Sequence, residues 1–337
     1  MKAILFEAPG SVPICTDVEL AKPRSGEIEV TITAAGVCHS DLHVVSGDWD
    51  IPTPVVLGHE GSGVVSALGP GVTDLSIGDH VVLSWVPSCG TCRYCLAGRP
   101  AQCALVAQVV APLGVLHDGT SRLSKDGHTL HHYLGVSSFA ERVMVPVSGA
   151  IRVRTDAPRD VLALVGCAVA TGVGAVMKTA NVQPGSTDAI DSSATDAVAA
   201  LREMVPEGLD YVFDAIGKIS TTEQAIAALG LGGAAVIVGL PPTRQHARFD
   251  PLALAEADQR ILGSNYRSVV PQRDIPWLVD LYMSGELDLD SLVSARRPLS
   301  EAAEALADLA AGRALRQPLV PSIRGAERAC SCAEESS

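Results

Sequence analysis

Apolar and polar positions follow two different patterns along the chain, and the change comes near residue 150. Residues 28–34 alternate strictly within EIEVTITA, and residues 63–67 and 80–84 are rich in β-branched side chains. Turns such as Gly69-Pro70-Gly71 separate these runs. Alternation with a period of two is typical of half-buried strands. The first part of the chain is therefore predicted to form an all-β, barrel-like domain.

From about residue 159 the pattern changes to helices that alternate with short apolar strands. We predict helices over 196–204 and 222–229, and strands over 210–215 and 234–239. Such alternation is typical of a parallel sheet covered by helices. Two amphipathic helices over 275–284 and 300–311 and a strand over 318–321 follow. The fold class is thus α/β plus β, with predicted domains at 1–158 and 159–271, a C-terminal return over 272–321 and an unordered tail over 322–337.

Composition and charge narrow the class of function. The chain has 337 residues, of which 47% are hydrophobic and 19% charged, which is sufficient for two well-formed cores. A net charge of −13 argues against a nucleic-acid or anionic-membrane partner. The segment 161–177 is uncharged but falls short of the about 20 apolar residues of a membrane span. The N-terminus MKAILFEAPGSV lacks a secretory pattern, so we expect a cytoplasmic protein.

Four cysteines form the most specific motif. Cys89, Cys92, Cys95 and Cys103 follow the spacing C-x2-C-x2-C-x7-C in a loop rich in Pro, Ser and Gly. Four thiolates at this spacing suit one closed, structural zinc ion. The alternative is a set of free buried thiols.

A second set of metal-binding residue types lies outside this motif. Cys38, the pair His59-Glu60 and Cys167 offer three strong zinc ligands and a carboxylate, which would leave one position open. Taken one by one, these residues would be read as ordinary core side chains. One closed and one open zinc site in a single chain favour an enzyme over a purely structural protein.

Four segments together show a family resemblance. GVCHSDLH at 36–43, GHEGSGVV at 58–65, the four-cysteine motif and GCAVATGVGA at 166–175 closely resemble the zinc-dependent alcohol dehydrogenases of the medium-chain dehydrogenase/reductase family. The resemblance spans residues 1 to about 320, apart from one gap. It implies a GroES-like catalytic domain, a Rossmann-like nucleotide domain, hydride transfer between an alcohol or aldehyde and NAD(P), and a homo-oligomer.

The resemblance also implies a role for individual residues. Cys38, His59 and Cys167 match the catalytic zinc ligands, and Glu60 is a neighbour that coordinates transiently. Asp41 would hold His59 from behind, as carboxylates often do for ligating histidines. Ser40 resembles the hydroxyl that accepts the alcohol proton, and His43 the end of the proton relay.

Further positions match the family's substrate and cofactor contacts. Trp49 and Trp85 fall where the family lines its substrate pocket, although both could be ordinary core aromatics. The positions that match cofactor contacts are His39 and Arg316 for the pyrophosphate, and Thr171, Ile216, Gly217 and Val238 for the nicotinamide or adenosine parts. Arg316 could instead be a solvated charge.

The chain departs from the family pattern after VQPGST at 182–187. The family continues with a strand, a G-x-G-x-x-G turn and a helix, but this chain runs directly into DAIDSSATDAVAALREM. The segment between Gly185 and Asp210 cannot hold a βαβ unit of about 30 residues as well as the predicted helix. The segment Gly230-Leu-Gly-Gly-Ala-Ala235 matches the spacing of the motif, but it precedes a predicted strand instead of following one.

The missing unit leaves two pairs of alternatives open. The chain is either a defective gene product or a variant that repacks a truncated sheet. Its function is either that of an alcohol dehydrogenase or that of a catalytically inactive zinc-binding scaffold. A group of three histidines at 128, 131 and 132 matches no motif, and we expect it to be exposed in a polar loop.

Overall fold

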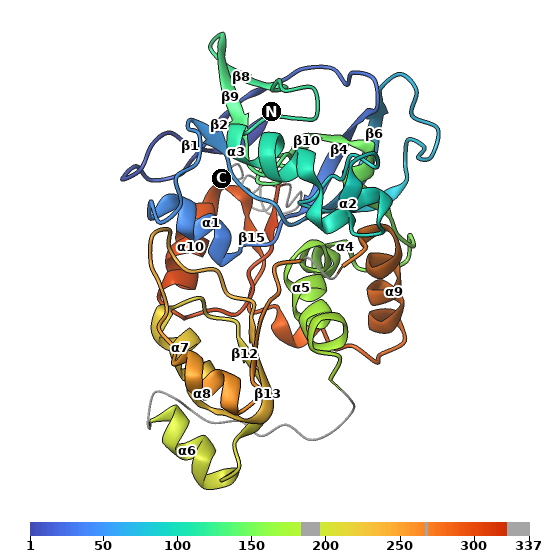
Figure 1. Ribbon diagram of the computed structural model, residues 1–337. Helices are drawn as coiled ribbons and strands as arrows, with labels where there is room; N and C mark the ends of the chain where they lie inside the picture. Colours follow the sequence, from blue (N-terminus) through green and yellow to red (C-terminus); the bar gives the residue numbers. More distant parts are fainter. Residues whose placement is uncertain (183–195, 267–268, 322–337) are drawn as a thin grey trace, which may run out of the picture.

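The computed structural model describes residues 1–182, 196–266 and 269–321. Figure 1 shows a β-rich part at the top and a smaller α/β part below it. The predicted β domain contains two sheets with the strand orders β2-β1-β5-β9-β8-β3 and β10-β4-β6-β7-β11. Their bounds are Lys2–Phe6 (β1), Ile14–Asp17 (β2), Glu19–Leu20 (β3), Glu27–Ala34 (β4), Val55–Val56 (β5), Gly61–Leu68 (β6), His80–Leu83 (β7), Leu123–Lys125 (β8), His128–His132 (β9), Arg142–Pro146 (β10) and Ala150–Arg152 (β11).

Strand β4 shows why the sequence pattern predicted this domain. Ile28, Val30 and Ile32 point into the core and are at most 3% exposed, whereas Thr31 is exposed. The strand pairs antiparallel with β6 and β10, so its apolar face is part of one continuous face of the sheet. Alternation along the chain thus becomes an inner and an outer face.

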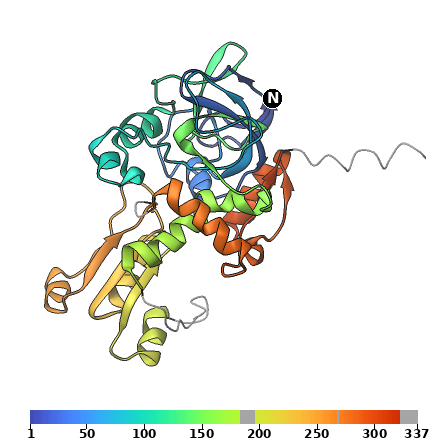
Figure 2. The same ribbon diagram turned by 90° about the vertical axis from the view of Figure 1, so that its right-hand side faces the viewer.

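Short helices complete this part of the molecule. They are α1 (His39–Val45), α2 (Arg93–Leu96), α3 (Ala111–Leu113) and α4 (Arg159–Leu162). Helix α5 (Ala168–Gly174) then continues as a π-helical segment over Ala175–Ala180. Figure 2 shows this green helix running from the β-rich part toward the α/β part.

The α/β part contains a sheet of three parallel strands among the described residues, in the order β12-β13-β14. The elements follow one another as α6 (Ala197–Met204), β12 (Leu209–Asp214), α7 (Ile219–Ala227), β13 (Leu229–Ile237), α8 (Pro251–Glu256) and β14 (Arg260–Gly263). This parallel sheet beside the β domain confirms the predicted fold class. Residues 183–195, where the family pattern breaks off, and the tail 322–337 lie outside the described residues.

The C-terminal segment packs on the β-rich part of the molecule. Helix α9 (Pro271–Met283) packs on a core shared with α4, and α10 (Ala302–Ala310) packs on the core of the strands. Strand β16 (Leu319–Val320) pairs with β15 (Arg297–Pro298), and Leu319 exchanges backbone hydrogen bonds with Ala35.

Some predicted bounds were wrong. Helix α7 begins at Ile219, three residues before the predicted start, because Asp214 accepts hydrogen bonds from Thr221 and Thr222 in its first turn. Strand β13 begins at Leu229, where a helix end had been predicted. The segment from Gly230 to Ala235 lies inside this strand, so it is no nucleotide-binding turn.

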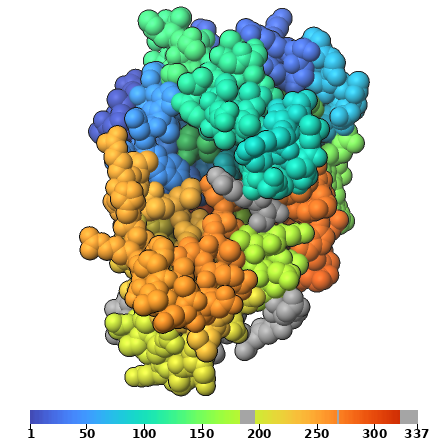
Figure 3. Space-filling view, in the orientation of Figure 1, coloured from blue at the N-terminus to red at the C-terminus, as the bar shows by residue number. Residues whose placement is uncertain are grey.

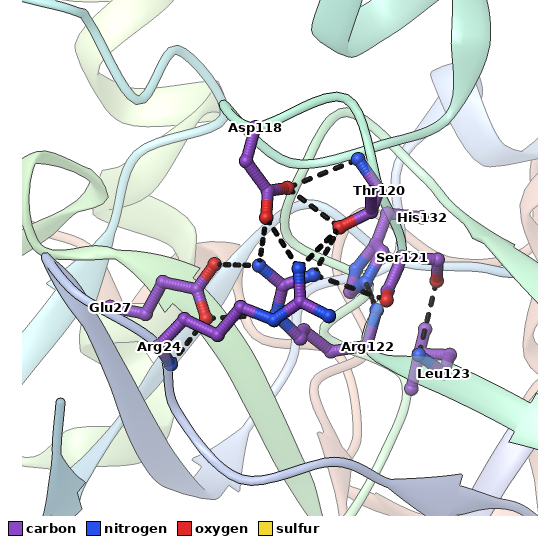
Figure 4. A network of polar contacts seen from close by, with 8 residues as sticks. All are labelled: Arg24, Glu27, Asp118, Thr120, Ser121, Arg122, Leu123 and His132. Atoms are coloured by element: carbon purple, nitrogen blue, oxygen red, sulfur yellow. Dashed lines mark hydrogen bonds and ion pairs between the residues drawn. The ribbon is translucent and has the colours of Figure 1, made fainter.

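The expectation for the three histidines was correct for His128, which is exposed, but wrong for His132 and for the loop. Residues 128–132 form β9, and His132 is only 2% exposed. Its Nε2 accepts a hydrogen bond from the backbone N–H of Arg122, whose guanidinium is fully buried against Glu27 and Asp118 (Figure 4). The polar sequence neighbours of His132 favour a surface position. Strand pairing and the buried ion pair of Arg122 place it in the interior instead.

No single helix of the described chain is long and apolar enough to cross a bilayer. Helices 159–166 and 168–180 pass the length and composition criteria only as a pair, with a bend of 51° between them.

Candidate functional site

The structure gathers the four motif cysteines in the loop that carries α2. The Sγ atoms of Cys89, Cys92, Cys95 and Cys103 all lie within 4.8 Å of one another. The distance from Cys92 Sγ to Cys95 Sγ is 3.6 Å, and that from Cys89 Sγ to Cys95 Sγ is 4.0 Å. Zn–S bonds of about 2.3 Å in a tetrahedron place sulfurs about 3.8 Å apart. The spacing therefore fits a structural zinc ion.

The protonation of these thiols supports the same fit. Backbone N–H groups lower the pKa of Cys92 to about 6, whereas burial raises the pKa of Cys95 to about 12. The backbone N–H of Cys92 donates to Cys89 Sγ, and that of Ala104 donates to Cys92 Sγ, at 3.4 Å each. Four thiolates this close would repel one another, and a bound divalent cation offsets that repulsion.

The second cluster forms where three distant segments meet. Cys38 precedes α1, His59 and Glu60 precede β6, and Cys167 lies at the start of α5. Their ligand atoms all lie within 4.8 Å of one another. Two thiols, an imidazole and a carboxylate make a donor set that suits zinc.

Glu60 gives the clearest sign that this cluster fits a cation. Its side chain is fully buried, and neither carboxylate oxygen accepts a hydrogen bond. Burial raises its pKa to about 7, although Arg316 Nη1 lies 3.7 Å from Oε1 and opposes the shift. A Cβ on Gly36 would lie 2.0 Å from Oε2, so a larger residue there would displace the Glu60 carboxylate. A buried carboxylate without a hydrogen bond is costly unless a cation shares its charge.

Asp41 lies behind His59, as the resemblance implied. Its Oδ2 is 3.4 Å from His59 Nδ1, and its carboxylate also accepts the backbone N–H groups of Cys38 and Gly58. Asp41 is fully buried. These contacts leave Nε2 as the His59 atom that can bind a metal.

Ser40 and His43 extend from the cluster along α1. The Cys38 thiol donates to Ser40 Oγ at 3.8 Å, and His43 lies one helical turn beyond Ser40. His43 Nδ1 is 2.8 Å from Asp48 Oδ2. The His43 ring also stacks on Trp49, with 4.8 Å between centroids.

The two tryptophans predicted for the substrate pocket lie in different surroundings. Trp49 donates its Nε1–H to Pro241 O at 3.3 Å and lines a cavity of about 230 Å³ with Ile51 and Thr243. Trp85 packs on Tyr266, with ring centroids 5.0 Å apart, and its buried Nε1 has no hydrogen-bond partner. Their role toward a substrate stays a prediction.

The residues predicted to contact the cofactor lie at the junction of the two parts. Thr171 is on α5, four residues beyond Cys167, and Val238 directly follows β13. Ile216 and Gly217 follow β12, and Ile216 is 60% exposed. Figure 3 shows the surface hollowed between the blue and teal upper part and the gold lower part.

The remaining two predicted cofactor contacts, His39 and Arg316, lie close to the metal-binding cluster. Desolvation lowers the pKa of His39, against the effect of Cys38, and the charges of Arg316, His43 and Lys218 add to the decrease. Arg316 also donates to Val37 O at 3.4 Å, so it is no freely solvated charge. The lowered pKa favours a neutral His39, so Arg316 is the positive charge beside the cluster.

Sequence reasoning missed three residues near this site. Asp48 contacts His43, and an acidic residue shortly after a candidate histidine is a signal that could have found it. Tyr133 donates to Ser40 O at 3.0 Å and places its ring edge on His59. Lys218 lies in the turn after β12. The last two have no local signal, because only the fold brings them to the site.

Comparison with known proteins agrees with this geometry. The family described as "Alcohol dehydrogenase GroES-like domain" matches residues 24–155, and "Zinc-binding dehydrogenase" matches residues 162–284. An alcohol dehydrogenase class-3 of Myxine glutinosa is 32% identical over 94% of this chain and 96% of its own length. Among solved structures, a benzyl alcohol dehydrogenase from Acinetobacter calcoaceticus has a TM-score of 0.88 at 29% identity, covering 95% of this chain and 99% of its own. An alcohol dehydrogenase zinc-binding domain protein from Burkholderia ambifaria has a TM-score of 0.86 at 33% identity, covering 95% and 99%.

The first of these alignments also shows how many positions this chain lacks in total. It runs over 365 positions, whereas 94% of 337 residues is about 317. This chain therefore has no residue at about 48 aligned positions. A deficit of this size is consistent with the loss of one βαβ unit of about 30 residues with its flanking segment.

Proposed function

The chain belongs to the zinc-dependent alcohol dehydrogenases of the medium-chain dehydrogenase/reductase family, and from that membership we propose that it transfers hydride between a small alcohol or aldehyde and a nicotinamide cofactor at the cluster of Cys38, His59, Glu60 and Cys167. The observation that carries this proposal is the buried Glu60 carboxylate, which accepts no hydrogen bond, beside two thiols and an imidazole. A structural scaffold needs no second, mixed-ligand cluster at a domain junction.

Each residue around the cluster has a separate task in this proposal. Cys38, His59 and Cys167 would hold zinc, and Asp41 would keep the His59 ring in one orientation through Nδ1. When bound, zinc supplies Lewis-acid polarisation, which lowers the pKa of an alcohol. The nicotinamide ring supplies hydride-accepting chemistry.

The chain's own proton path would start at Ser40. Its hydroxyl lies beside Cys38 and can accept the alcohol proton. His43 follows one turn later, and Asp48 holds its Nδ1, which leaves Nε2 free to carry a proton toward solvent. Trp49 and Trp85 would border the substrate, with the stacked Trp49 also fixing the His43 ring.

A metal-content assay combined with turnover tests the proposal. The zinc-loaded chain is expected to hold two zinc ions and to reduce NAD⁺ or NADP⁺ in the presence of simple alcohols. His59→Ala should lower the zinc content to one and abolish turnover, whereas His128→Ala, at an exposed position, should change neither. Two bound zinc ions with no alcohol-dependent turnover would instead support the inactive scaffold.

A homo-oligomer is the second part of this proposal. The described sheet ends at β14, whose outer edge carries backbone groups without a partner strand in the described chain. Such edges favour pairing with another strand. Light scattering of the zinc-loaded chain should give a multiple of 34.9 kDa, and a mass of one chain would contradict the expectation.

A further inference from the structure

The described α/β part has the secondary-structure elements of a single nucleotide-binding half. Its elements follow one another as β12-α7-β13-α8-β14, with all three strands parallel and in sequence order. The full dinucleotide-binding fold consists of two such βαβαβ halves, each of which holds one mononucleotide of the cofactor. This unit therefore has the elements for one mononucleotide.

The sequence leaves too little chain for the second half. Residues 183–195 are all that separates Val182 from the residue that caps α6, whereas even one βαβ unit takes about 30 residues. In the described chain, β12 is the outer strand of the sheet and pairs only with β13. The missing half would carry the glycine-rich turn and the acidic residue that binds the adenosine ribose.

The half that is present contacts the segment that follows α1, the helix that begins beside Cys38. Pro241 and Thr243, in the loop that leaves β13, accept from Trp49 Nε1 and donate to Asp48 O respectively. Ligands of open parallel sheets bind beyond the carboxyl ends of the strands. A mononucleotide at these ends would therefore lie beside α1 and the cluster, where hydride transfer has to occur.

The turn after β12 indicates how a phosphate could be held there. The N–H groups of Ile216 and Gly217 already donate to Asp214 Oδ1, at 3.1 and 3.2 Å. The turn therefore offers few free backbone donors, and side chains must supply the positive charge. Lys218 lies in this turn, and Arg316 lies at the same junction, beside Glu60.

We propose, on the basis of the function proposed above, that this chain recognises its cofactor as a nicotinamide mononucleotide, with Lys218 at the phosphate, and that an adenosine moiety adds no affinity. The same geometry predicts equal affinity for NADH and NADPH, because the residue that would read the 2′ position belongs to the absent half.

Binding titrations of the zinc-loaded full chain test this inference. Reduced nicotinamide mononucleotide, NADH and NADPH are titrated while tryptophan fluorescence is followed, and dihydronicotinamide riboside serves as the ligand without phosphate. The three phosphorylated ligands are expected to bind with dissociation constants within about threefold of one another. A dinucleotide that binds tenfold more tightly, which is about 1.4 kcal/mol, would overturn the inference. The absence of saturable binding by any of the three would overturn it as well.

A variant pair tests the phosphate contact. Lys218→Gln should weaken the mononucleotide about fivefold and leave the riboside unchanged, whereas Lys22→Gln, at an exposed position of the β domain, should change neither. Equal weakening of both ligands by Lys218→Gln would remove Lys218 from the phosphate. Turnover separates this inference from the function itself. Alcohol oxidation with a much tighter dinucleotide refutes only the inference, whereas equal binding without alcohol-dependent turnover refutes only the function.

Discussion

Glu27→Gln is expected to destabilise the β domain far more than a matched change two residues away. Arg122 is 0% exposed and Glu27 is 8% exposed, and their side chains form two hydrogen bonds, at 2.5 and 2.9 Å (Figure 4). Removal of one member of a buried ion pair costs about 3–5 kcal/mol, because the other charge stays buried. Asp118 still contacts the guanidinium at 2.6 Å and is 40% exposed, which favours the lower end, about 3 kcal/mol.

Glu29→Gln is the control on the same strand. Glu29 pairs with Arg142 at 3.3 Å, and the Arg142 side chain is 44% exposed, so the expected cost is about 0.5 kcal/mol. Urea unfolding of the zinc-loaded chain, followed by tryptophan fluorescence, measures both. With an m-value of about 3 kcal/mol/M, Glu27→Gln should lower the midpoint by about 1 M and Glu29→Gln by about 0.2 M. Equal midpoints for the two variants would refute the reasoning that burial sets the cost.

Three further predictions concern the four-cysteine loop, the proposed proton relay and the loss of stability at acidic pH. Cys103→Ala should lower the zinc content by one and expose the loop to proteolysis, whereas Cys15→Ala, at an exposed thiol, should do neither. Asp48→Asn removes the carboxylate from His43 Nδ1 and should lower turnover about tenfold with little change in the Michaelis constant for the alcohol, as steady-state kinetics can show. Burial alone would raise the pKa of Asp118, but its hydrogen bonds with Arg122 and Thr120 lower this pKa well below the ordinary value of an aspartate. Its stabilising contribution is therefore present above pH about 4 and is lost as the pH falls, and Asp118→Asn should flatten the pH dependence of the urea midpoint between pH 4 and pH 2.

The sequence predicted those features that depend on local spacing. The alternation in β4 predicted its buried face, and the cysteine spacing predicted a cluster whose sulfurs lie within 4.8 Å. The second cluster was also predicted, but only because three motifs acted together. Nothing in the spacing of Cys38, His59 and Cys167 requires them to meet.

The features that sequence reasoning missed depend on tertiary contacts. His132 is buried because β9 pairs with β5 and Arg122 lies against Glu27, a residue 95 positions away. The start of α7 depends on Asp214, which belongs to the preceding strand. Propensity and periodicity report on neighbours in sequence, and long-range partners override them.

The hydrogen bonds from Thr243 to Asp48 O connect two parts of the molecule that have different tasks. Asp48 contacts His43, the histidine of the proposed relay, through its side chain, and the loop beyond β13 through its main chain. A shift of that loop when a ligand arrives would thus be transmitted to the proton-handling end of α1 through one residue. Under the proposed function, nucleotide binding and proton release would thus be mechanically coupled through Asp48.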